Sequence, residues 1–173
     1  MKPILFSDLD GTLIGTTTGN TFPQGIWDMS LRLYVFDAIK RLDPEVIFIV
    51  SNQGGIEEGY VTIEQLSAKI GYICKAIEDY CGIPCHSMFC GSMSKNDPYR
   101  KPNTKMLERL AITHIGDNLK EIKQRSLMIG DASGKEGQYS DTDKRTAENF
   151  GIKYLDVNDF VRIKDFNELW SKE

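Results

Sequence analysis

The sequence predicts an α/β fold in which a parallel sheet of about five strands lies between two layers of helices, a three-layer Rossmann-like arrangement. Short apolar segments recur along the 173 residues, and segments with the apolar spacing of helices separate them. Polar or glycine-containing turns follow most of the apolar segments. Because strands alternate with helices along the whole length, each helix is expected to cross from one strand to a parallel neighbour. A chain of this length is expected to form one domain, residues 1–173.

Five segments are predicted strands. Residues 2–8 have the pattern of a buried strand, and residues 46–50 form a short, β-branched and wholly apolar run. Such a run is typical of a strand that helices cover on both faces. The weaker pattern of residues 86–90 and the apolar segments 126–130 and 152–157 complete the sheet.

The helix after the second strand is the best defined. Thr62 and Gln65 have the spacing of a capping box at its start. Gly82 can end it, because glycine adopts the left-handed conformation found after helix C-termini. Its apolar face consists of residues at helical spacing: Ile63, Leu66, Ile70, Ile73, Cys74 and Ile77.

Four further helices are predicted. They cover residues 27–42, residues 142–150 (closed by Gly151) and residues 164–171. Another is expected to have Asn103 as its N-cap and to carry the apolar residues Met106, Leu107 and Leu110.

Composition limits the classes of function. Hydrophobic residues make up 40% of the chain and charged residues 27%, which is typical of globular proteins. The net charge of −4 argues against binding of nucleic acid over the whole surface. Apolar runs are too short to span a membrane, and the first ten residues lack the apolar region of a signal peptide. We therefore expect a cytoplasmic protein without a membrane partner.

The four cysteines allow two interpretations. Cys81, Cys85, His86 and Cys90 could form a zinc site, but they lack the second clean pair that structural zinc sites use. Cys74 and Cys81 also fall on the apolar face of a predicted helix. Buried, reduced thiols are therefore the favoured interpretation.

Polar residues at the predicted strand ends carry the functional signal, because ligands of such sheets bind at the carboxyl ends of the strands. Asp8 and Asp10 follow the first strand, with Gly11 and Thr12 after them. Two carboxylates this close repel each other unless a cation lies between them, and oxygen ligands favour Mg²⁺. Ser51 ends the second strand and precedes a glycine-containing turn, where its hydroxyl can donate to a phosphoryl oxygen.

Two further charged residues belong to this set. Lys101 stands before Pro102, where an ammonium group can neutralise phosphate, and Asp131 follows the strand 126–130. Residues 130–135 do not form a nucleotide-binding P-loop, because the spacing is one residue short and Glu136 stands where Ser or Thr is required.

These four segments, in this order, resemble the four motifs of the haloacid-dehalogenase-like phosphohydrolases. Within that superfamily the sequence is most similar to the phosphatase domain of polynucleotide kinase 3′-phosphatases. The segments that carry the narrower resemblance are residues 8–14, 19–23 with Trp27, 52–56 with Gly59, 99–102 with Met106, and 130–134 with Ser140, Asp143, Ala147, Asn149 and Gly151.

The resemblance implies a catalytic role for four residues. Asp8 would be the nucleophile that forms an aspartyl-phosphate, and Asp10 the general acid and then the general base. Ser51 and Lys101 would hold the phosphoryl oxygens. A phosphate monoester needs a large rate enhancement, and an anionic nucleophile can attack it only where cations offset the repulsion.

The resemblance also implies binding roles. Mg²⁺ would be bound by the Asp8 carboxylate, the Asp10 main-chain carbonyl and Asp131, with Asp143 as a supporting carboxylate near the metal. The phosphate of the substrate would contact Thr12, Ser51, Asn52 and Lys101. Three acidic side chains from distant parts of the chain are thus expected to converge beside one ammonium group.

The sequence also departs from the family pattern. Asn20 and Tyr60 stand where the family often has lysine, and Ser51 replaces the usual threonine but keeps its hydroxyl. The chain has no Walker A sequence, so the kinase half of the family is missing. A separate polynucleotide kinase or ligase is considered as a partner, and whether a kinase is encoded separately is left open.

The expected substrate is the 3′-phosphorylated end of a nucleic acid. The segments between the predicted strands leave no room for a large cap domain, so the site would be open to the end of a polymer. Residues 91–125 hold eight basic and four acidic residues, a balance that suits the phosphate backbone. Aromatic residues near the opening could stack on terminal bases: Phe22, Trp27, Tyr60 and Tyr99.

Two alternatives remain at this stage. One is a small-molecule phosphatase similar to the histidinol-phosphate or heptose-bisphosphate phosphatases, which commonly carry a zinc-binding Cys/His loop. The cysteines here lack that arrangement. The other is a catalytically silent interaction domain, which the intact set of Asp8, Asp10, Lys101 and Asp131 argues against. The oligomeric state is left open.

Overall fold

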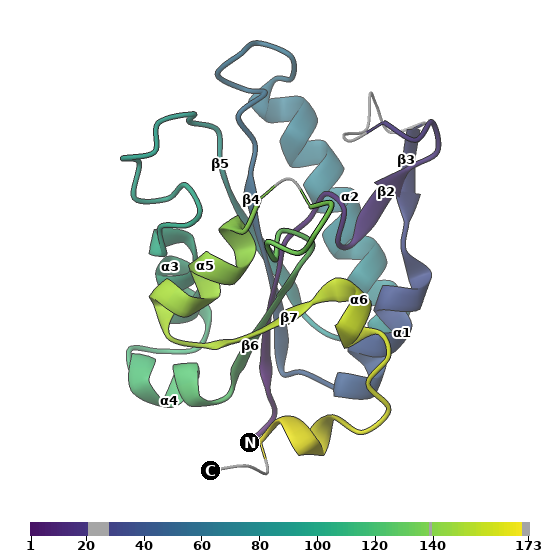
Figure 1. Cartoon of the computed structure of the whole chain (residues 1–173), viewed down its shortest axis with the longest axis vertical. Coiled ribbons are helices and arrows are strands. Elements are labelled where there is room, and N and C mark those ends of the chain that lie inside the picture. The colour runs from purple at the N-terminus through teal and green to yellow at the C-terminus, as the bar shows by residue number, and fades with distance from the viewer. Residues whose placement is uncertain (21–27, 139, 171–173) are drawn as a thin grey trace.

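A five-stranded parallel sheet forms the centre of the protein, as the sequence predicts (Figure 1). The computed structural model describes residues 1–20, 28–138 and 140–170. The strand order is β5-β4-β1-β6-β7. The strands are β1 (Ile4–Ser7), β4 (Val46–Asn52), β5 (Cys85–Cys90), β6 (Ser126–Gly130) and β7 (Lys153–Asp156).

Strand β1 lies in the middle of the sheet and sets the register of the site. Ser7, its last residue, pairs with Ile49 of β4 and with Ile129 of β6. All four residues of β1 are buried, which explains why this strand lacks the polar–apolar alternation of a half-exposed strand. The residues that follow β1, β4 and β6 therefore emerge at the same edge of the sheet.

Helices cover both faces of the sheet, which confirms the three-layer fold (Figure 1). On one face, α1 (Leu33–Leu42), α2 (Ile63–Cys81) and α6 (Val157–Phe160) pack against apolar strand residues such as Leu5 and Ile47. On the other face, α3 (Lys105–His114), α4 (Leu119–Gln124) and α5 (Thr142–Phe150) contribute to a core with Phe6 and Phe48. Burial of these two apolar clusters is the main force that holds the layers together.

Helix α2 begins and ends where the sequence predicts. The Thr62 hydroxyl accepts from the main-chain N–H of Gln65 (3.2 Å), and the Gln65 side chain accepts from the N–H of Thr62 (3.0 Å). Gly82 follows the helix with a φ of 72°, a conformation that favours glycine. Of the predicted apolar row, Leu66, Ile70, Ile73 and Ile77 are buried and Cys74 is half-buried, whereas Ile63 is exposed.

The helix predicted over 27–42 is wrong at its start. Helix α1 begins at Leu33, and Met29–Leu31 forms strand β3, which pairs antiparallel with β2 (Ile14–Thr16). Residue 27 lies outside the described residues. A pairing between segments this far apart is decided by tertiary contacts, which override the local helical pattern.

Other boundaries also differ from the predictions. The N-cap of α3 is Thr104 rather than Asn103, because the Asn103 side chain donates to the carbonyls of Lys95 (3.1 Å) and Asp97 (2.7 Å). Strand β7 is shorter than the predicted 152–157, and α6 starts within that range at Val157.

The end of the chain and one connection also differ. The last predicted helix, 164–171, contains the 3₁₀ helix η2 (Phe166–Leu169), and residue 171 is outside the described part. The short helix α4 was not predicted.

The connections in the described residues are short enough to leave the carboxyl edge of the sheet uncovered by a large cap. The segment between β1 and β4 holds β2, β3 and α1, and the segment between β4 and β5 holds α2. No large cap domain occurs in these described segments. None of the described helices is both long and apolar enough to cross a membrane.

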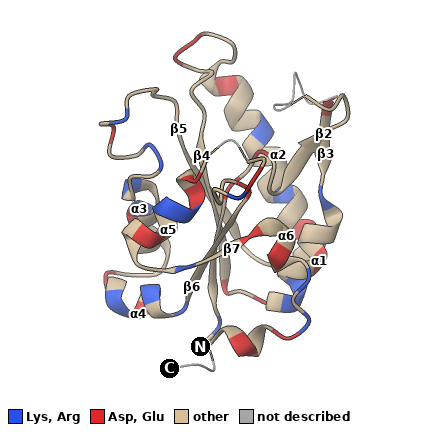
Figure 2. Ribbon diagram, in the orientation of Figure 1, with Lys and Arg blue, Asp and Glu red and all other residues tan. Residues whose placement is uncertain are grey.

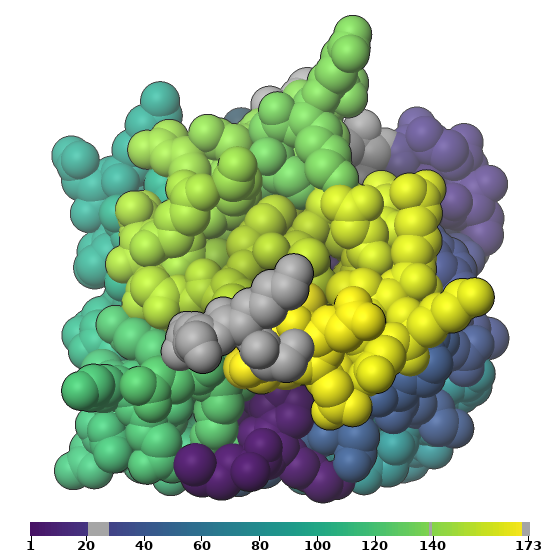
Figure 3. Space-filling model, turned by 60° about the horizontal axis from the view of Figure 1, so that its bottom comes forward, coloured from purple at the N-terminus to yellow at the C-terminus, as the bar shows by residue number. Residues whose placement is uncertain are grey.

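The first residues of the chain and the C-terminal part of its described residues lie together at the opposite end of the sheet. Figure 3 shows the first residues in purple and the C-terminal segment in yellow on the same face. A hollow of about 210 Å³ between them is lined by residues that include Met1, Pro3, Phe166 and Trp170. This hollow lies at the amino ends of the strands, away from the polar residues that follow β1, β4 and β6.

Candidate active site

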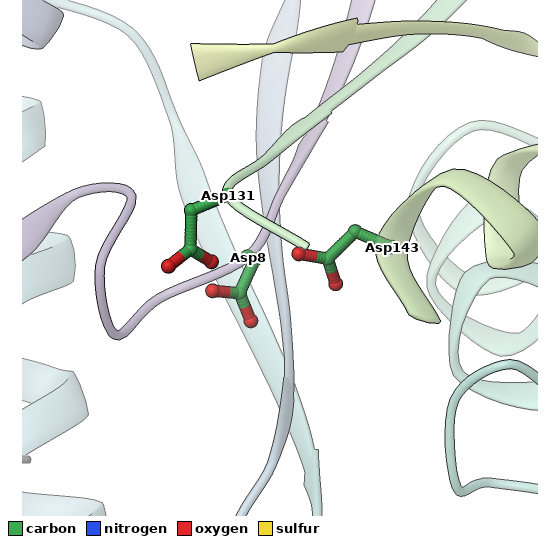
Figure 4. Close-up of side chains that lie close together, drawn as sticks. All are labelled: Asp8, Asp131 and Asp143. Carbon is green, nitrogen blue, oxygen red and sulfur yellow. The ribbon is translucent and has the colours of Figure 1, made fainter. Parts of the chain in front are cut away.

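Three carboxylates from distant parts of the chain converge at the carboxyl edge of the sheet (Figure 4). Asp8 follows β1, Asp131 follows β6, and Asp143 lies in the first turn of α5. One carboxylate oxygen from each residue lies within 4.8 Å of one from each of the others. Asp8 and Asp131 lie close together, as the sequence predicts. Asp143 was predicted only as a supporting carboxylate nearby, but its side chain is part of the same cluster.

Lys101 supplies the positive charge beside this cluster. Its Nζ lies 2.6 Å from Asp8 Oδ1 and 2.7 Å from Asp143 Oδ1, and its side chain is only 2% exposed. The side chain of Asn52 fixes the main chain of Lys101, because Oδ1 accepts from its N–H (2.9 Å) and Nδ2 donates to its carbonyl (3.0 Å). The Asn52 amide thus holds the main chain of Lys101 in place, and in this way it helps to position the ammonium group.

The electrostatics of the cluster favour an added cation. Burial raises the pKa of Asp8 to about 8, with Asp143 and Asp131 adding to the rise and Lys101 opposing it. Burial and Asp143 also raise the pKa of Asp131. Burial alone would lower the pKa of Lys101, but Asp143 and Asp8 outweigh it and the pKa is raised. Three carboxylates beside one ammonium group therefore leave an excess of buried negative charge.

The donor set fits Mg²⁺. All three clustered groups are carboxylates, and Mg²⁺ prefers oxygen ligands and is commonly held by one or two carboxylates with substrate phosphate and water. Asp8, Asp131 and Asp143 are the residues whose carboxylates would hold it, and the Asp10 main-chain carbonyl stays a predicted ligand. Among the described residues, this is the one group of three or more acidic, histidine or cysteine side chains that lie close enough to bind a metal ion together.

Asp10 lies apart from the cluster, in a second charged pair. Its Oδ1 accepts from Lys69 Nζ (2.9 Å), and its Oδ2 accepts from Gln53 Nε2 (2.6 Å). Gln53 Nε2 is also 2.7 Å from Ser51 Oγ. The side chains of Asp10 and Lys69 are 9% and 17% exposed, so this pair is nearly buried at the wall of the site.

Lys69 and Gln53 are site residues that the sequence does not predict. A weak signal was present, because Lys69 directly precedes Ile70 in the apolar row of α2. A lysine beside the buried face of a helix often has a partner. Gln53 lies two residues after Ser51, in the turn that follows β4.

The turn after β1 is shaped by close packing around Asp8. The buried Thr12 hydroxyl donates to Asp8 Oδ2 (3.3 Å), so it orients the carboxylate. Gly11 has a φ of 81°, and a Cβ at this position would overlap the carboxylate of Asp131. The guanidinium of Arg32 donates to the Gly11 carbonyl and holds the turn from behind. Arg32 is a further residue that the sequence analysis missed.

Asp143 is positioned by the loop after β6. The main-chain N–H of Ala132 donates to Asp143 Oδ2 (3.1 Å). A Cβ at Gly130 would overlap the Asp143 side chain, so the absence of a side chain there allows α5 to approach the end of β6. Asp143 therefore reaches Lys101 with one oxygen and the loop with the other.

The residues of the considered zinc site are not gathered as ligands. Cys85 belongs to the core on the α2 face of the sheet, and Cys90 to the core on the α3 face. His86 stacks on His114, with ring centroids 3.7 Å apart, and the Cys81 thiol faces the carbonyl of Phe36 (3.7 Å). All four cysteines are free thiols, but only Cys85 and Cys90 are buried as the favoured interpretation expects, whereas Cys74 and Cys81 are half-buried.

The aromatic residues predicted near the opening differ in exposure. Tyr60 is 83% exposed, whereas Tyr99 is half-buried against the core that contains Met106. Phe22 and Trp27 lie outside the described residues.

The fold is that of the haloacid-dehalogenase-like (HAD-like) phosphatases. A protein of Mesorhizobium loti assigned to this class superposes with a TM-score of 0.66 at 22% identity, over 92% of this chain and 84% of its own. The D,D-heptose 1,7-bisphosphate phosphatase of B. bronchiseptica, solved with magnesium and phosphate, also has a TM-score of 0.66, at 18% identity over 89% of this chain and 79% of its own.

Within this class, the chain belongs to the polynucleotide kinase 3 phosphatase family, whose sequence model matches residues 3–160. An uncharacterized 20.8 kDa protein of Autographa californica nuclear polyhedrosis virus is 31% identical over 90% of this chain and 84% of its own length. The bifunctional polynucleotide phosphatase/kinase of Schizosaccharomyces pombe is 32% identical over 88% of this chain. The match covers only 36% of that longer relative. The predicted family is thereby confirmed.

Proposed function

We propose that this protein is a Mg²⁺-dependent phosphomonoesterase that removes the 3′-phosphate from nucleic-acid ends. The observation that carries the proposal is the buried group of Asp8, Asp131 and Asp143 with Lys101 Nζ 2.6 Å from Asp8. A nucleophile, an oxygen-ligand set and a fixed cation stand together where the strands end. Phosphoryl transfer depends mainly on such positioning and charge neutralisation.

In the first half of the reaction, an Asp8 oxygen attacks phosphorus while the bond from phosphorus to the ester oxygen breaks. The product is an aspartyl-phosphate, and Asp10 gives a proton to the leaving alkoxide. Thr12 orients Asp8, and Lys101 offsets the charge of the phosphoryl oxygens. Bound Mg²⁺ supplies further neutralisation of negative charge.

In the second half, water attacks the phosphorus of the aspartyl-phosphate and gives its proton to Asp10. Inorganic phosphate leaves, and the Asp8 carboxylate is restored. Both oxygens of Asp10 accept hydrogen bonds from Lys69 and Gln53, so the side chain has to release one of these donors and bind a proton before it can protonate the ester oxygen. Ser51, already within reach of Gln53, is the proposed hydroxyl donor to the phosphate.

Three observations support a nucleic-acid end as the substrate. The chain belongs to the polynucleotide kinase 3 phosphatase family, and a bifunctional relative of S. pombe is 32% identical to it. In addition, the described connections form no large cap over the edge of the sheet. An open site can receive the end of a long polymer, which a capped site would exclude.

Phosphate release from a panel of esters tests the proposal. The panel contains a 3′-phosphorylated oligonucleotide, its 5′-phosphorylated counterpart, and sugar and amino-alcohol phosphates, each with the protein and Mg²⁺. We expect preference for the 3′-phosphorylated end and no release by Asp8→Asn. Preference for a small ester would instead indicate a metabolite phosphatase, and no release from any ester would indicate a silent interaction domain.

The role of Asp10 has its own test. Asp10→Asn is expected to abolish turnover of the oligonucleotide but to keep Mg²⁺ binding, measured by calorimetry, because the clustered carboxylates are unchanged. Full activity of this variant would refute Asp10 as the acid.

A further inference from the structure

An open groove of about 530 Å³ lies beside the active-site lysine. It is formed by the loop between β5 and α3, the first residue of α3 and the last turn of α5. Its polar lining consists of six side chains, with two prolines between them: Lys95, Asn96, Asn103, Thr104, Lys105 and Asn149.

The lining of this groove is suited to an anionic ligand. It contains two ammonium groups, three side-chain amides and one hydroxyl but no carboxylate, although the protein has 25 acidic residues and a net charge of −4. The Asn103 amide already donates to two main-chain carbonyls, so the two lysines are the main groups that the lining offers to an anion. Lys95 is exposed, and the Lys105 side chain is 40% exposed beside Glu108 (3.0 Å). The nearby Asp97 does not line the groove. Its carboxylate accepts a hydrogen bond from the main-chain N–H of Tyr99 (2.8 Å) within the same loop.

Hydrogen bonds within the protein fix the walls of the groove. Asn103 Nδ2 donates to the carbonyl of Lys95, which folds the loop back on itself. Asn149 Nδ2 donates to the carbonyl of Pro102 (3.0 Å), which ties α5 to the loop. The groove therefore has a built shape, and two lysines project at its edge.

The groove is next to the active site but separate from it. Pro102, in its wall, directly follows Lys101. Asp143 and Asn149 lie six residues apart on α5, which corresponds to about 9 Å along a helix axis. This separation is too large for the group bound at Asp8, and it places the far end of the groove beyond the nucleotide that carries the reacting phosphate.

We propose that this groove binds the phosphodiester backbone of the strand whose 3′ end is held at Asp8. That this strand is the one whose 3′ end reacts at Asp8 rests on the proposed function. Ammonium and amide groups are the usual protein contacts to phosphate oxygens, and they hold a strand without reading its sequence. In Figure 2, the loop after β5 carries blue segments, and the helices α3 and α5 carry both blue and red segments.

Charge reversal of the two groove lysines tests the proposal. The variant carries Lys95→Glu and Lys105→Glu, and its matched control carries Lys164→Glu and Lys75→Glu. Lys164 is exposed like Lys95, and Lys75 pairs with Asp79 on its own helix as Lys105 pairs with Glu108. Both variants change the net charge by the same amount, so a difference between them reports position rather than total charge.

Binding of a single-stranded 12-nucleotide DNA with a free 3′-hydroxyl is measured by fluorescence anisotropy at several salt concentrations. The groove variant is expected to bind the DNA on the order of tenfold more weakly, whereas the affinity of the control changes little. The slope of the logarithm of the binding constant against the logarithm of the salt concentration should become shallower by about 1.4 in the groove variant, which corresponds to two lost phosphate contacts. Turnover of p-nitrophenyl phosphate should be the same in both variants, which confirms that they are folded and active. Equal DNA affinity of the two variants would overturn the proposal.

A separate measurement distinguishes this failure from failure of the proposed function. If the unaltered protein releases phosphate from the 3′-phosphorylated 12-mer but the two variants bind DNA equally, only the groove is wrongly assigned. If it releases none, the proposed function fails, and the binding comparison still decides whether the groove holds a strand.

Discussion

Replacement of Lys101 by methionine is the most direct test of the charge balance in the site. Methionine keeps most of the length of the side chain but removes the ammonium group that lies 2.6 Å from Asp8 and 2.7 Å from Asp143. At an effective dielectric constant of about 20, each contact corresponds to an attraction of about 6 kcal/mol before desolvation is subtracted. Breaking a buried pair typically costs about 3–5 kcal/mol, because it leaves a buried charge without a partner.

We therefore expect Lys101→Met to lower the free energy of unfolding by about 3–5 kcal/mol when EDTA removes metal ions. Mg²⁺ should restore stability more in the variant than in the unaltered protein, because the uncompensated carboxylates gain more from a cation. Urea denaturation followed by circular dichroism at pH 7, with EDTA or with Mg²⁺, measures both effects.

Lys75→Met is the matched control, because Lys75 pairs with Asp79 at the exposed surface of α2 and exposed pairs contribute little. Its unfolding curve should match that of the unaltered protein. An unfolding free energy of Lys101→Met in EDTA that also equals the unaltered value would refute the inference that Lys101 compensates buried carboxylates.

Three further measurements test other parts of the structure. Because burial raises the pKa of Asp8 from 3.8 to about 8, its contribution to stability without metal should be lost as pH rises from about 4 to 8, and Mg²⁺ should reduce this loss; urea denaturation at a series of pH values checks it. Lys69→Met should lower kcat more for alkyl phosphates than for p-nitrophenyl phosphate, because only the poorer leaving group needs a well-placed proton from Asp10. Lys69→Arg should recover part of the lost kcat. Equal losses of kcat on both esters would argue against a role of Lys69 in positioning Asp10. Burial and the stacked His86 lower the pKa of His114, so stability should fall as pH drops below about 6.5, and His114→Gln should show a smaller fall between pH 7.5 and 5.5 in the same assay.

The parts of the fold that the sequence predicted are those set by local patterns. Strands β1, β4 and β6 are short apolar runs because both faces are covered, and α2 has a capping box at one end and a glycine at the other. The β2–β3 hairpin was missed because each strand has only three residues. Its existence depends on a pairing across more than ten residues, which no local pattern shows.

The candidate site was predicted to the extent that its residues follow strands. Asp8, Asp131 and Ser51 come directly at or after strand ends, so sheet topology alone brings them to one edge. Asp143 was expected near the metal but not within the cluster, because the length of the loop before α5 hides how far the helix approaches β6. Lys69 could not be placed, since its contact with Asp10 depends on how deeply α2 packs against the sheet.

Two lysines from opposite layers divide the acidic residues of the site between them. Lys69, from α2, balances Asp10, so this pair adds no net charge. Lys101, from the loop before α3, serves the three clustered carboxylates, so two negative charges are uncompensated when all three are ionised. A phosphate monoester dianion would be repelled by that excess, whereas one divalent cation cancels it. Under the proposed function, the carboxylates must therefore be neutralised before an ester lies against Asp8, and the proposed strand would be held by lysines outside the cluster.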